Sequence, residues 1–162
     1  MKILDVETPL GILRLTQDGG NLCSAVFPED SFRYTAHTPL LDEAKAQIDA
    51  YFSGRAIAFN LPLSIAGTEF EQQVMRALLG IPYGQTHTYS QIAMQIGRPK
   101  AVRAVGRACS RNRLLLFIPC HRVISAQGRL TGFAAGLNRK RALLALEGIA
   151  CAESKPPAKP VA

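Results

Sequence analysis

The chain has 162 residues, of which 48% are hydrophobic, so it is long enough to bury one sizeable core or two small ones. No apolar run approaches the roughly 20 residues of a membrane-spanning helix, and the N-terminal segment lacks the apolar core of a secretory signal. Composition therefore favours a globular protein with a cytosolic or nuclear location and argues against contact with a membrane.

The cysteines are few and widely spaced along the chain, at Cys23, Cys109, Cys120 and Cys151. There is no Cys-x-x-Cys pair and no Cys/His cluster with the spacing of a zinc site. Cys23 and His37 could supply two ligands at most, which do not make a site, so we expect no metal. In a reducing compartment the thiols are expected to stay free.

The net charge of +7 is distributed unevenly. Residues 1–71 contain ten acidic and five basic residues, whereas residues 72–146 contain twelve Lys or Arg and no Asp or Glu. Such an excess of positive charge favours a polyanionic partner, because neutralised phosphates release counterions and give affinity that does not depend on sequence. The alternative is a basic surface that only keeps the protein in solution.

The first part of the chain, 1–64, is predicted to form a small α/β unit. Apolar residues alternate in several short segments bounded by Gly, Pro and Asp, and they recur at helical spacing in one longer segment. The predicted elements are strands at 2–8, 12–16, 21–27 and 56–63 and a helix over 39–54. No catalytic group is recognised in this unit.

The second unit, 65–152, is predicted to begin with a helix capped by Thr68 and Glu71, which form a T-x-x-E capping box. Two further helices, over 88–97 and 101–112, are joined by a tight Gly/Pro turn. This arrangement is typical of a helix-turn-helix. The Pro-, Ala- and Lys-rich tail, 153–162, is predicted to be disordered.

The second helix of this pair has two faces. Apolar residues fall on one stripe, and basic residues at intervals of three and four fall on another. The basic residues are Lys100, Arg103, Arg107 and Arg111. A solvated basic face is the ordinary interpretation of such a stripe. Because no acidic residue lies nearby to pair with these side chains, we favour contact with DNA instead.

The segment 113–124, RLLLFIPCHRVI, is predicted to be a buried strand that Pro119 ends just before Cys120. A buried cysteine is usually an inert apolar residue. Cys120 differs because His121 and Arg122 follow it directly, in the basic half of the chain, where a thiolate would be stabilised. If the strand continued, His121 would point to the opposite face from Cys120, so their coupling would need a turn or a bridging water.

The motif IPCHRVI, followed by GRLTGFAAGLNRKRALLALEG, resembles the O6-alkylguanine-DNA alkyltransferases, also called methylated-DNA–protein-cysteine methyltransferases. The likeness extends from Thr68 to Gly148 and includes TEFEQQVMRALLGIPYG, TYSQIA and AVRAVGRA. The resemblance implies an α+β fold, with a ribonuclease H-like first unit and a winged-helix-like second unit that carries the reactive cysteine. In the first unit the likeness is limited to TPLG and the order of elements.

The resemblance implies a role for each matching residue of the site. Cys120 matches the alkyl acceptor, His121 the imidazole that reaches the thiol through a water, and Glu147 the carboxylate that orients the imidazole. Asn112 matches the asparagine that stabilises the turn around the site. Tyr89 matches the tyrosine beside the flipped nucleotide, whose hydroxyl could donate a proton to the departing base.

Further positions match residues that touch DNA or the base. The implied DNA-binding residues are Arg103, which would enter the base stack, and Tyr89, Ser90, Arg98, Lys100, Arg107 and Ala126. The implied pocket residues are Phe133, Val123, Ala134 and Pro119. No cofactor is implied, and the expected partner is double-stranded DNA containing O6-alkylguanine, bound by a monomer. Such a protein would be cytoplasmic and associated with the nucleoid in a bacterium, or nuclear in a eukaryote.

The family chemistry fits these residue types. A saturated alkyl carbon must be displaced in line, for which a soft thiolate is the best nucleophile, and the duplex must release the nucleotide first. The thioether product has no carbonyl for water to attack, so each molecule is expected to react once. The resemblance therefore implies direct repair of O6-alkylguanine, and of O4-alkylthymine, by transfer to Cys120.

Three departures from the family pattern affect the expected rate and substrate range. Phe133 stands where a tyrosine is usual, which leaves the ring but removes its hydroxyl. The pair Ala134–Ala135 replaces residues richer in glycine, and Arg113 and Leu115 replace a proline-rich stretch. None of these changes removes the nucleophile.

Three other functions are weighed against repair. A damage-binding protein without transfer would have lost the cysteine, which Cys120 argues against. A cysteine hydrolase using Cys120 and His121 would leave the basic helix without a purpose. A helix-turn-helix regulator would explain the basic helix but not the IPCHRVI motif.

Overall fold

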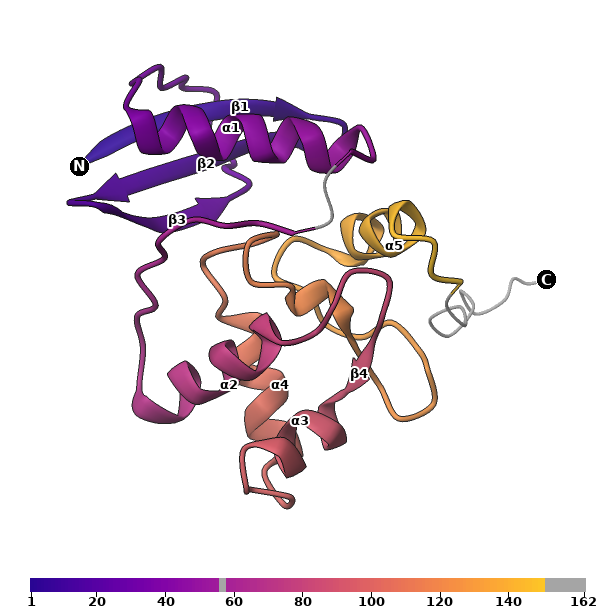
Figure 1. Cartoon of the computed structure of the whole chain (residues 1–162). Coiled ribbons are helices and arrows are strands. Elements are labelled where there is room, and N and C mark those ends of the chain that lie inside the picture. Colours follow the sequence, from indigo (N-terminus) through magenta and orange to yellow (C-terminus); the bar gives the residue numbers. More distant parts are fainter. Residues whose placement is uncertain (56–57, 151–162) are drawn as a thin grey trace.

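The computed structural model describes residues 1–55 and 58–150, and the tail predicted to be disordered lies outside the described residues. A three-stranded sheet with one helix forms the first unit, and short helices surrounding an irregular segment form the second (Figure 1). The described part has no helix long and apolar enough to cross a membrane.

The first unit contains β1 (Lys2–Thr8), β2 (Gly11–Asp18) and β3 (Asn21–Val26), which form an antiparallel sheet in that order. Alternate residues of β1 and β2 are buried, as the pattern predicts, whereas the adjacent Ser24 and Ala25 of β3 are both buried. Helix α1 (Pro39–Phe52) begins at Thr38, whose side chain accepts a hydrogen bond from a backbone N–H of the first turn, and it packs along the sheet (Figure 1). The three strands and the helix predicted over 39–54 are confirmed.

The strand predicted over 56–63 is wrong for the described residues, 58–63. The alternation is real, because Phe59, Leu61 and Leu63 are half-buried and the residues between them are exposed. Only Leu63 forms a β-bridge, to Leu22 of β3. Pro62 has no N–H to donate, and another segment of the chain occupies the rest of this sheet edge, so the segment is extended without a ladder.

The second unit begins with α2 (Glu69–Leu79), for which the predicted capping box is present, and continues with α3 (Tyr89–Gln95) and α4 (Val102–Ser110). Helix α4 packs against both α2 and α3, so the helix-turn-helix is confirmed. Strand β4 (His87–Thr88) precedes α3 and pairs in parallel with β5 (Val123–Ile124). Helix α5 (Leu137–Leu146) completes the unit.

The buried strand predicted over 113–124 is also wrong, except for β5. Residues Leu114 to Ile118 form a tight turn, closed by a hydrogen bond of 2.9 Å from the N–H of Ile118 to the carbonyl of Leu114. A 3-10 helix over Cys120–Arg122 follows. Leu116, at a φ of 77°, is the one non-glycine residue with positive φ in the described part, a conformation that costs about 1–3 kcal/mol. An apolar run indicates burial, but it does not distinguish a strand from such a turn.

The two units share a sheet edge. The N–H of Ala25 in β3 donates to the carbonyl of Arg113 at 2.7 Å, and the N–H of Leu115 donates back to Ala25 at 2.9 Å. The turn that precedes the 3-10 helix therefore continues the sheet of the first unit. This pairing provides hydrogen-bond partners for backbone N–H and C=O groups of β3 that would be unpaired if β3 were an exposed edge strand.

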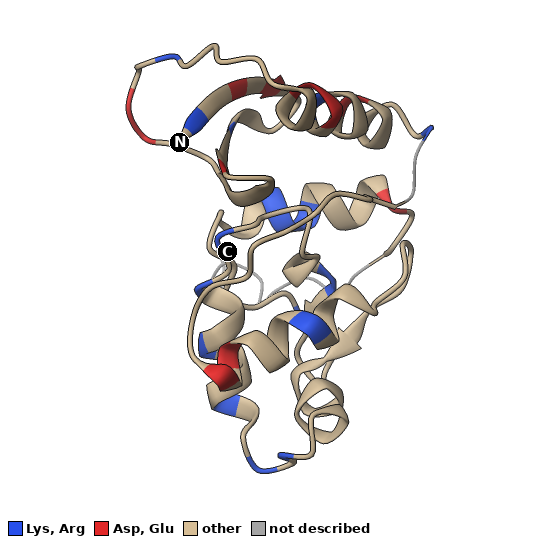
Figure 2. Cartoon of the chain, turned by 60° about the vertical axis from the view of Figure 1, so that its left-hand side comes forward, with Lys and Arg blue, Asp and Glu red and all other residues tan. Residues whose placement is uncertain are grey.

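The charges separate as the sequence predicts. Acidic residues gather on the first unit and at the start of α2, and basic residues are spread over the helices of the second unit (Figure 2). The exposed basic residues of the helix-turn-helix therefore create a positive surface away from the acidic sheet, which suits a polyanionic partner.

Candidate active site

Cys120 and His121 lie side by side in the 3-10 helix and are both buried, with 2% and 0% of their surface exposed. The turn before this helix brings Cys120 back toward Ile118, whose carbonyl accepts the N–H of Cys120 at 2.7 Å. In a continued strand the two side chains would point to opposite faces. The 3-10 helix removes that obstacle to coupling between thiol and imidazole.

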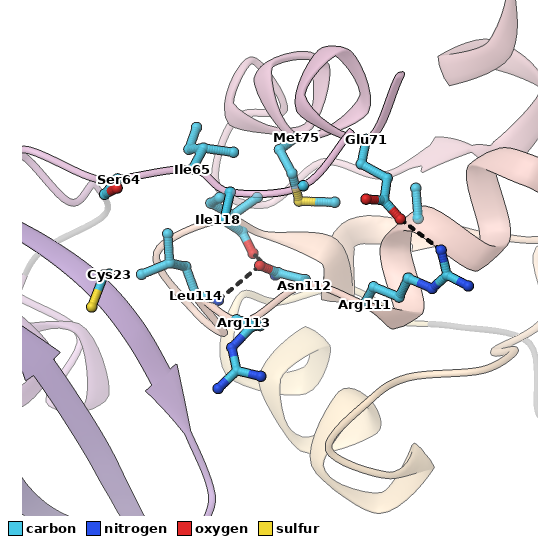
Figure 3. A pocket seen from close by; sticks show the side chains of 13 residues that line it. Cys23, Ser64, Ile65, Glu71, Met75, Arg111, Asn112, Arg113, Leu114 and Ile118 are labelled. Carbon is cyan, nitrogen blue, oxygen red and sulfur yellow. Dashed lines mark hydrogen bonds and ion pairs between the residues drawn. The ribbon is translucent and has the colours of Figure 1, made fainter. Parts of the chain in front are cut away.

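Asn112 holds the turn together from behind the thiol. Its side-chain NH₂ donates to the carbonyl of Ile118 at 2.9 Å and to Sγ of Cys120 at 3.1 Å, while its oxygen accepts the N–H of Leu114 at 2.9 Å. The amide also lines a pocket of about 200 Å³ between the two units (Figure 3). Asn112 thereby fixes the sulfur relative to the turn and supplies a donor that favours the thiolate.

Glu147 follows α5 and is the centre of a buried network. Its Oε2 lies 2.8 Å from Nε2 of His121 and accepts from Nη2 of Arg122 at 3.0 Å. Its Oε1 accepts from Nε of Arg122 at 2.8 Å and from the N–H of Gly84 at 3.1 Å. Gly84 has a φ of 80°, a conformation that glycine adopts readily. The carboxylate is therefore held at both oxygens.

The protonation states follow from burial and these contacts. Burial raises the pKa of Cys120 to about 11, although the hydrogen bond from Asn112 opposes the shift. Burial lowers the pKa of His121, against the opposing effect of Glu147. Burial alone would raise the pKa of Glu147, but the hydrogen bonds from His121 and Arg122 outweigh it and lower the pKa to about 2. The resting site at neutral pH holds a thiol, a neutral imidazole and a carboxylate.

The hydrogen bond to Glu147 determines which nitrogen of His121 carries the proton. A carboxylate can only accept, so Nε2 must donate to it and Nδ1 is left without a proton. Nδ1 is buried and has no hydrogen-bond partner among the described residues. It is therefore the nitrogen of His121 that is available to accept a proton.

Arg122 has a different role from the one the sequence suggested. We expected it to stabilise a thiolate at Cys120, but its guanidinium binds Glu147 through two nitrogens and the carbonyl of Ile81 at 2.7 Å. That expectation is wrong, because the arginine is committed to the carboxylate. Arg122 fixes the carboxylate that holds His121.

Tyr89, at the start of α3, lies on the other side of the site. Its hydroxyl accepts from Oγ1 of Thr131 at 3.1 Å, so its own proton is not used in that bond. Burial raises the pKa of Tyr89, which keeps it protonated. Nζ of the buried Lys140 lies 5.8 Å from the centre of the Tyr89 ring and donates to the carbonyl of Thr131 at 2.8 Å. Its positive charge lowers the pKa of Cys120, although less than burial raises it.

Tyr89 and Arg103 line the same open groove, which runs between α4 and the segment at Thr131 and Gly132. Arg107 lines this groove as well. The basic residues predicted to contact DNA are exposed, namely Arg98, Lys100, Arg103 and Arg107. The groove is therefore lined by one tyrosine, Tyr89, and by two arginines of α4, Arg103 and Arg107.

The prediction that no acid pairs with the basic stripe is wrong for Arg111, whose Nη1 lies 2.8 Å from Oε2 of Glu71 on α2 (Figure 3). The two residues are 40 positions apart, so the packing of α4 on α2 creates a pair that sequence distance conceals. Arg111 belongs to the wall of the inter-unit pocket.

The remaining predicted residues surround the site at different depths. Pro119 and Val123 are buried, Ser90 and Phe133 are half-buried, and Ala126 and Ala134 are exposed. Phe133 packs against the core, so the ring that replaces the usual tyrosine remains in place. Pro119 lines a pocket with Tyr83 and Arg122.

Sequence reasoning missed Tyr51, which joins the Glu147 network, and Lys140, which lies near Tyr89 and Thr131. Tyr51, on α1, donates to Oε2 of Glu147 at 2.6 Å. It occupies an apolar position of an amphipathic helix, where a tyrosine is ordinarily a core residue. Lys140 gave a clearer signal, because its position on α5 faces the core and a lysine there needs a partner.

Comparison with known proteins identifies the family. The profile described as 6-O-methylguanine DNA methyltransferase, DNA binding domain, matches residues 69–149. The profile described as 6-O-methylguanine DNA methyltransferase, ribonuclease-like domain, matches residues 5–65. The chain belongs to the 6-O-methylguanine DNA methyltransferase family. The resemblance drawn from the motifs and the expected α+β fold are both confirmed.

Individual members of the 6-O-methylguanine DNA methyltransferase family resemble the chain over most of its length. It is 44% identical over 147 residues to the methylated-DNA–protein-cysteine methyltransferase of Mycobacterium tuberculosis, covering 88% of this chain and 89% of that protein. The constitutive enzyme of the same name from Bacillus subtilis is 43% identical over 147 residues, covering 85% and 89%. A crystal structure of M. tuberculosis OGT in complex with DNA matches with a TM-score of 0.84 and 44% identity, covering 91% and 92%.

Proposed function

We propose that the protein repairs DNA by moving the alkyl group of O6-alkylguanine, and of O4-alkylthymine, directly onto Cys120. The observation that carries the proposal is a buried Cys120 next to His121, which is hydrogen-bonded to a fixed Glu147 in a unit that also carries a basic helix-turn-helix. The family membership supports the same reaction, because relatives matched over most of the chain are named as methyltransferases of this kind.

The transfer is an in-line displacement at the alkyl carbon. Sγ of Cys120 forms the new bond to carbon while the bond from carbon to O6 of guanine breaks, and O6 keeps the electron pair. The thiol proton passes through a water to Nδ1 of His121, and the imidazolium is stabilised by Glu147. The hydroxyl of Tyr89 donates a proton to the departing guanine, and the proton taken up by His121 then returns through solvent to the Tyr89 oxygen. The products are a neutral guanine and an S-alkylcysteine, with both side chains back in their starting protonation states. The reaction balances without a cofactor.

The resting thiol is protected by its environment. A buried thiol with a pKa of about 11 is almost wholly protonated at neutral pH, and thiols are poor nucleophiles. Entry of the base would bring the alkyl carbon to the sulfur while His121 removes the proton. Adventitious alkylation and oxidation are thereby slowed until the substrate is in place.

The product explains why the protein acts once. A thioether has no carbonyl for water to attack, and the site has no group that could remove an alkyl chain from sulfur. Each molecule therefore accepts one alkyl group, and the reaction is stoichiometric and irreversible. Repair capacity equals the number of protein molecules.

The groove on α4 supports the binding of duplex DNA with an extruded nucleotide. O6 lies within the stacked duplex, so the nucleotide must rotate out, at a cost of a few kcal/mol. Arg103 is exposed, lines the groove and would fill the vacated place in the stack. Ser90, Arg98, Lys100 and Arg107 would contact phosphates, which suits damage that occurs in any sequence.

The proposed groups all belong to one chain, so a single copy suffices for the reaction. The protein would act as a monomer on duplex DNA, in the cytoplasm and nucleoid of a bacterium or the nucleus of a eukaryote. Val123 and Ala134 would contact the flipped base through their backbone groups. Phe133 and Pro119 would line its pocket, and Ala126 would lie near the DNA. The missing hydroxyl of Phe133 would affect the rate or the range of alkyl groups accepted.

One experiment tests the proposal against a damage-binding protein and a cysteine hydrolase. The protein is mixed with duplex DNA that carries a labelled methyl group on guanine O6, and the label is located by mass spectrometry of peptides. We expect one label per molecule on the peptide that contains Cys120. Tight binding without transfer, or repeated turnover of an ester, would overturn the proposal.

A further inference from the structure

Tyr51 lies in the last turn of α1, in the first unit, and is 1% exposed. Aromatic rings surround it. The ring centroids of Phe52, Phe59 and Tyr83 are 5.2, 5.3 and 6.0 Å from its own. Phe59 in turn packs on Phe117 of the active-site turn at 4.7 Å. The phenol is thus fixed in direction by rings from both units.

The hydroxyl of Tyr51 donates to Oε2 of Glu147 at 2.6 Å, across 96 residues of sequence. Burial and the adjacent carboxylate both raise the pKa of Tyr51, so the phenol remains protonated and is the donor. The same oxygen lies 2.8 Å from Nε2 of His121. A tyrosine with a purely structural role could donate its hydroxyl proton to any acceptor. Tyr51 instead donates to the same carboxylate oxygen as His121, the candidate general base.

We propose that Tyr51 is a positioning residue through which the first unit adjusts the reactivity of Cys120. Its hydroxyl donates to the Glu147 oxygen that also holds His121, so it sets both the orientation of that oxygen and its negative charge. The inference rests on the proposed function, because it concerns the same proton path.

The effect has a definite sign. A proton donated by Tyr51 partly neutralises Oε2, which weakens the stabilisation that Glu147 gives to the imidazolium of His121. The hydroxyl therefore keeps His121 neutral and able to accept the thiol proton. The other groups hydrogen-bonded to the carboxylate of Glu147 in the described residues are His121, Arg122 and Gly84, all from the second unit. Lys140, which lowers the pKa of His121, also belongs to the second unit.

The first measurement follows His121 without any transfer. The full-length protein is labelled with ¹⁵N-histidine, the signals are assigned with His37→Gln and His87→Gln, and the titration of His121 is recorded. We expect Tyr51→Phe to make protonation of His121 up to about tenfold more favourable, the scale of one hydrogen bond to a charged group. Tyr83→Phe is the matched control, because its hydroxyl binds the carbonyl of Leu146 in the same ring cluster.

The second measurement records the transfer rate from O6-benzylguanine between pH 5 and 9. We expect the acid limb of the profile to move to higher pH in Tyr51→Phe and the plateau to fall by about threefold to tenfold, because the carboxylate loses a fixed contact. Replacing Tyr51 by 3-fluorotyrosine keeps the ring and strengthens the donor. We expect the 3-fluorotyrosine variant to move the acid limb to lower pH. If the Tyr51→Phe variant does not fold, the shift measured with 3-fluorotyrosine is sufficient to test the inference.

Opposite shifts from the two Tyr51 variants, with none from Tyr83→Phe, support the inference. An unchanged titration and profile, or equal shifts from Tyr51→Phe and Tyr83→Phe, overturn it, because general repacking would then explain the effect. Failure of the proposed function is distinguishable. In that case the wild-type protein transfers no alkyl group, while the titration of His121 still responds to Tyr51.

Discussion

The two units of the molecule contribute unequally to the site. The second unit supplies the thiol, the imidazole, the carboxylate and the basic groove, and its active-site segment is a turn and a 3-10 helix. The first unit is a regular sheet and helix, and it contacts the site from behind, through β3, Phe59 and Tyr51. Chemical groups can therefore be confined to one unit while their geometry depends on both.

The largest effect is expected from Cys120→Ala, which removes the only atom that forms a bond to the alkyl group. Transfer should be abolished, because the other free thiols of the described residues, Cys23 and Cys109, lie on β3 and α4 and not in the 3-10 helix that carries His121. Affinity for duplex DNA should persist, since the basic groove is unchanged. Mass spectrometry of the intact protein and a DNA-binding titration check the two parts. Residual stoichiometric labelling would show that the acceptor lies elsewhere.

Glu147→Gln tests how far the reaction depends on the carboxylate that both units hold. The amide keeps the shape but cannot stabilise an imidazolium, so we expect transfer to slow by about 10²-fold. Because the buried Arg122 loses its charged partner, stability should also fall by about 3 kcal/mol. Rates are therefore measured per folded molecule, with the exposed Glu7→Gln as control. A loss of less than about threefold would contradict the assigned role.

Arg103→Ala separates the groove from the chemistry. On duplex DNA the transfer rate should fall by about tenfold, since the vacated place in the stack is left unfilled. With free O6-benzylguanine, which needs no extrusion, the rate should equal that of the wild type. Arg76→Ala, on the exposed side of α2, controls for loss of a positive charge. Equal slowing on both substrates would show that Arg103 has no part in extrusion.

The smallest effect is expected from Phe133→Tyr, which restores the hydroxyl that this chain lacks. The ring is already packed against the core, so the change adds one polar group without a cavity. We expect transfer from O6-methylguanine to speed up by no more than about tenfold, the scale of one hydrogen bond. Single-turnover rates on duplex substrates with methyl and benzyl groups check this. Slower transfer of both groups would mean that the pocket is adapted to an aromatic ring without a hydroxyl group at position 133.

The sequence by itself determined helices α1 to α4, the three strands of the sheet, the basic helix-turn-helix and the family motif with its cysteine, but it did not predict α5. These features depend on neighbours within one or two turns, such as the capping box of Thr68 and Glu71, and local patterns record them directly. The family motif also identified Glu147 and Asn112 as candidates, although not how they are held.

Only the tertiary structure decided the shape of the segment at 113–124 and the partners of its buried charges. An apolar run specifies burial, but the turn there is imposed by Asn112 and by pairing with β3, both set by how the units pack. The contacts of Arg122 and Tyr51 with Glu147 span 25 and 96 residues of sequence. A single sequence carries no periodic signal for such contacts, because they arise from the meeting of distant elements in the folded chain.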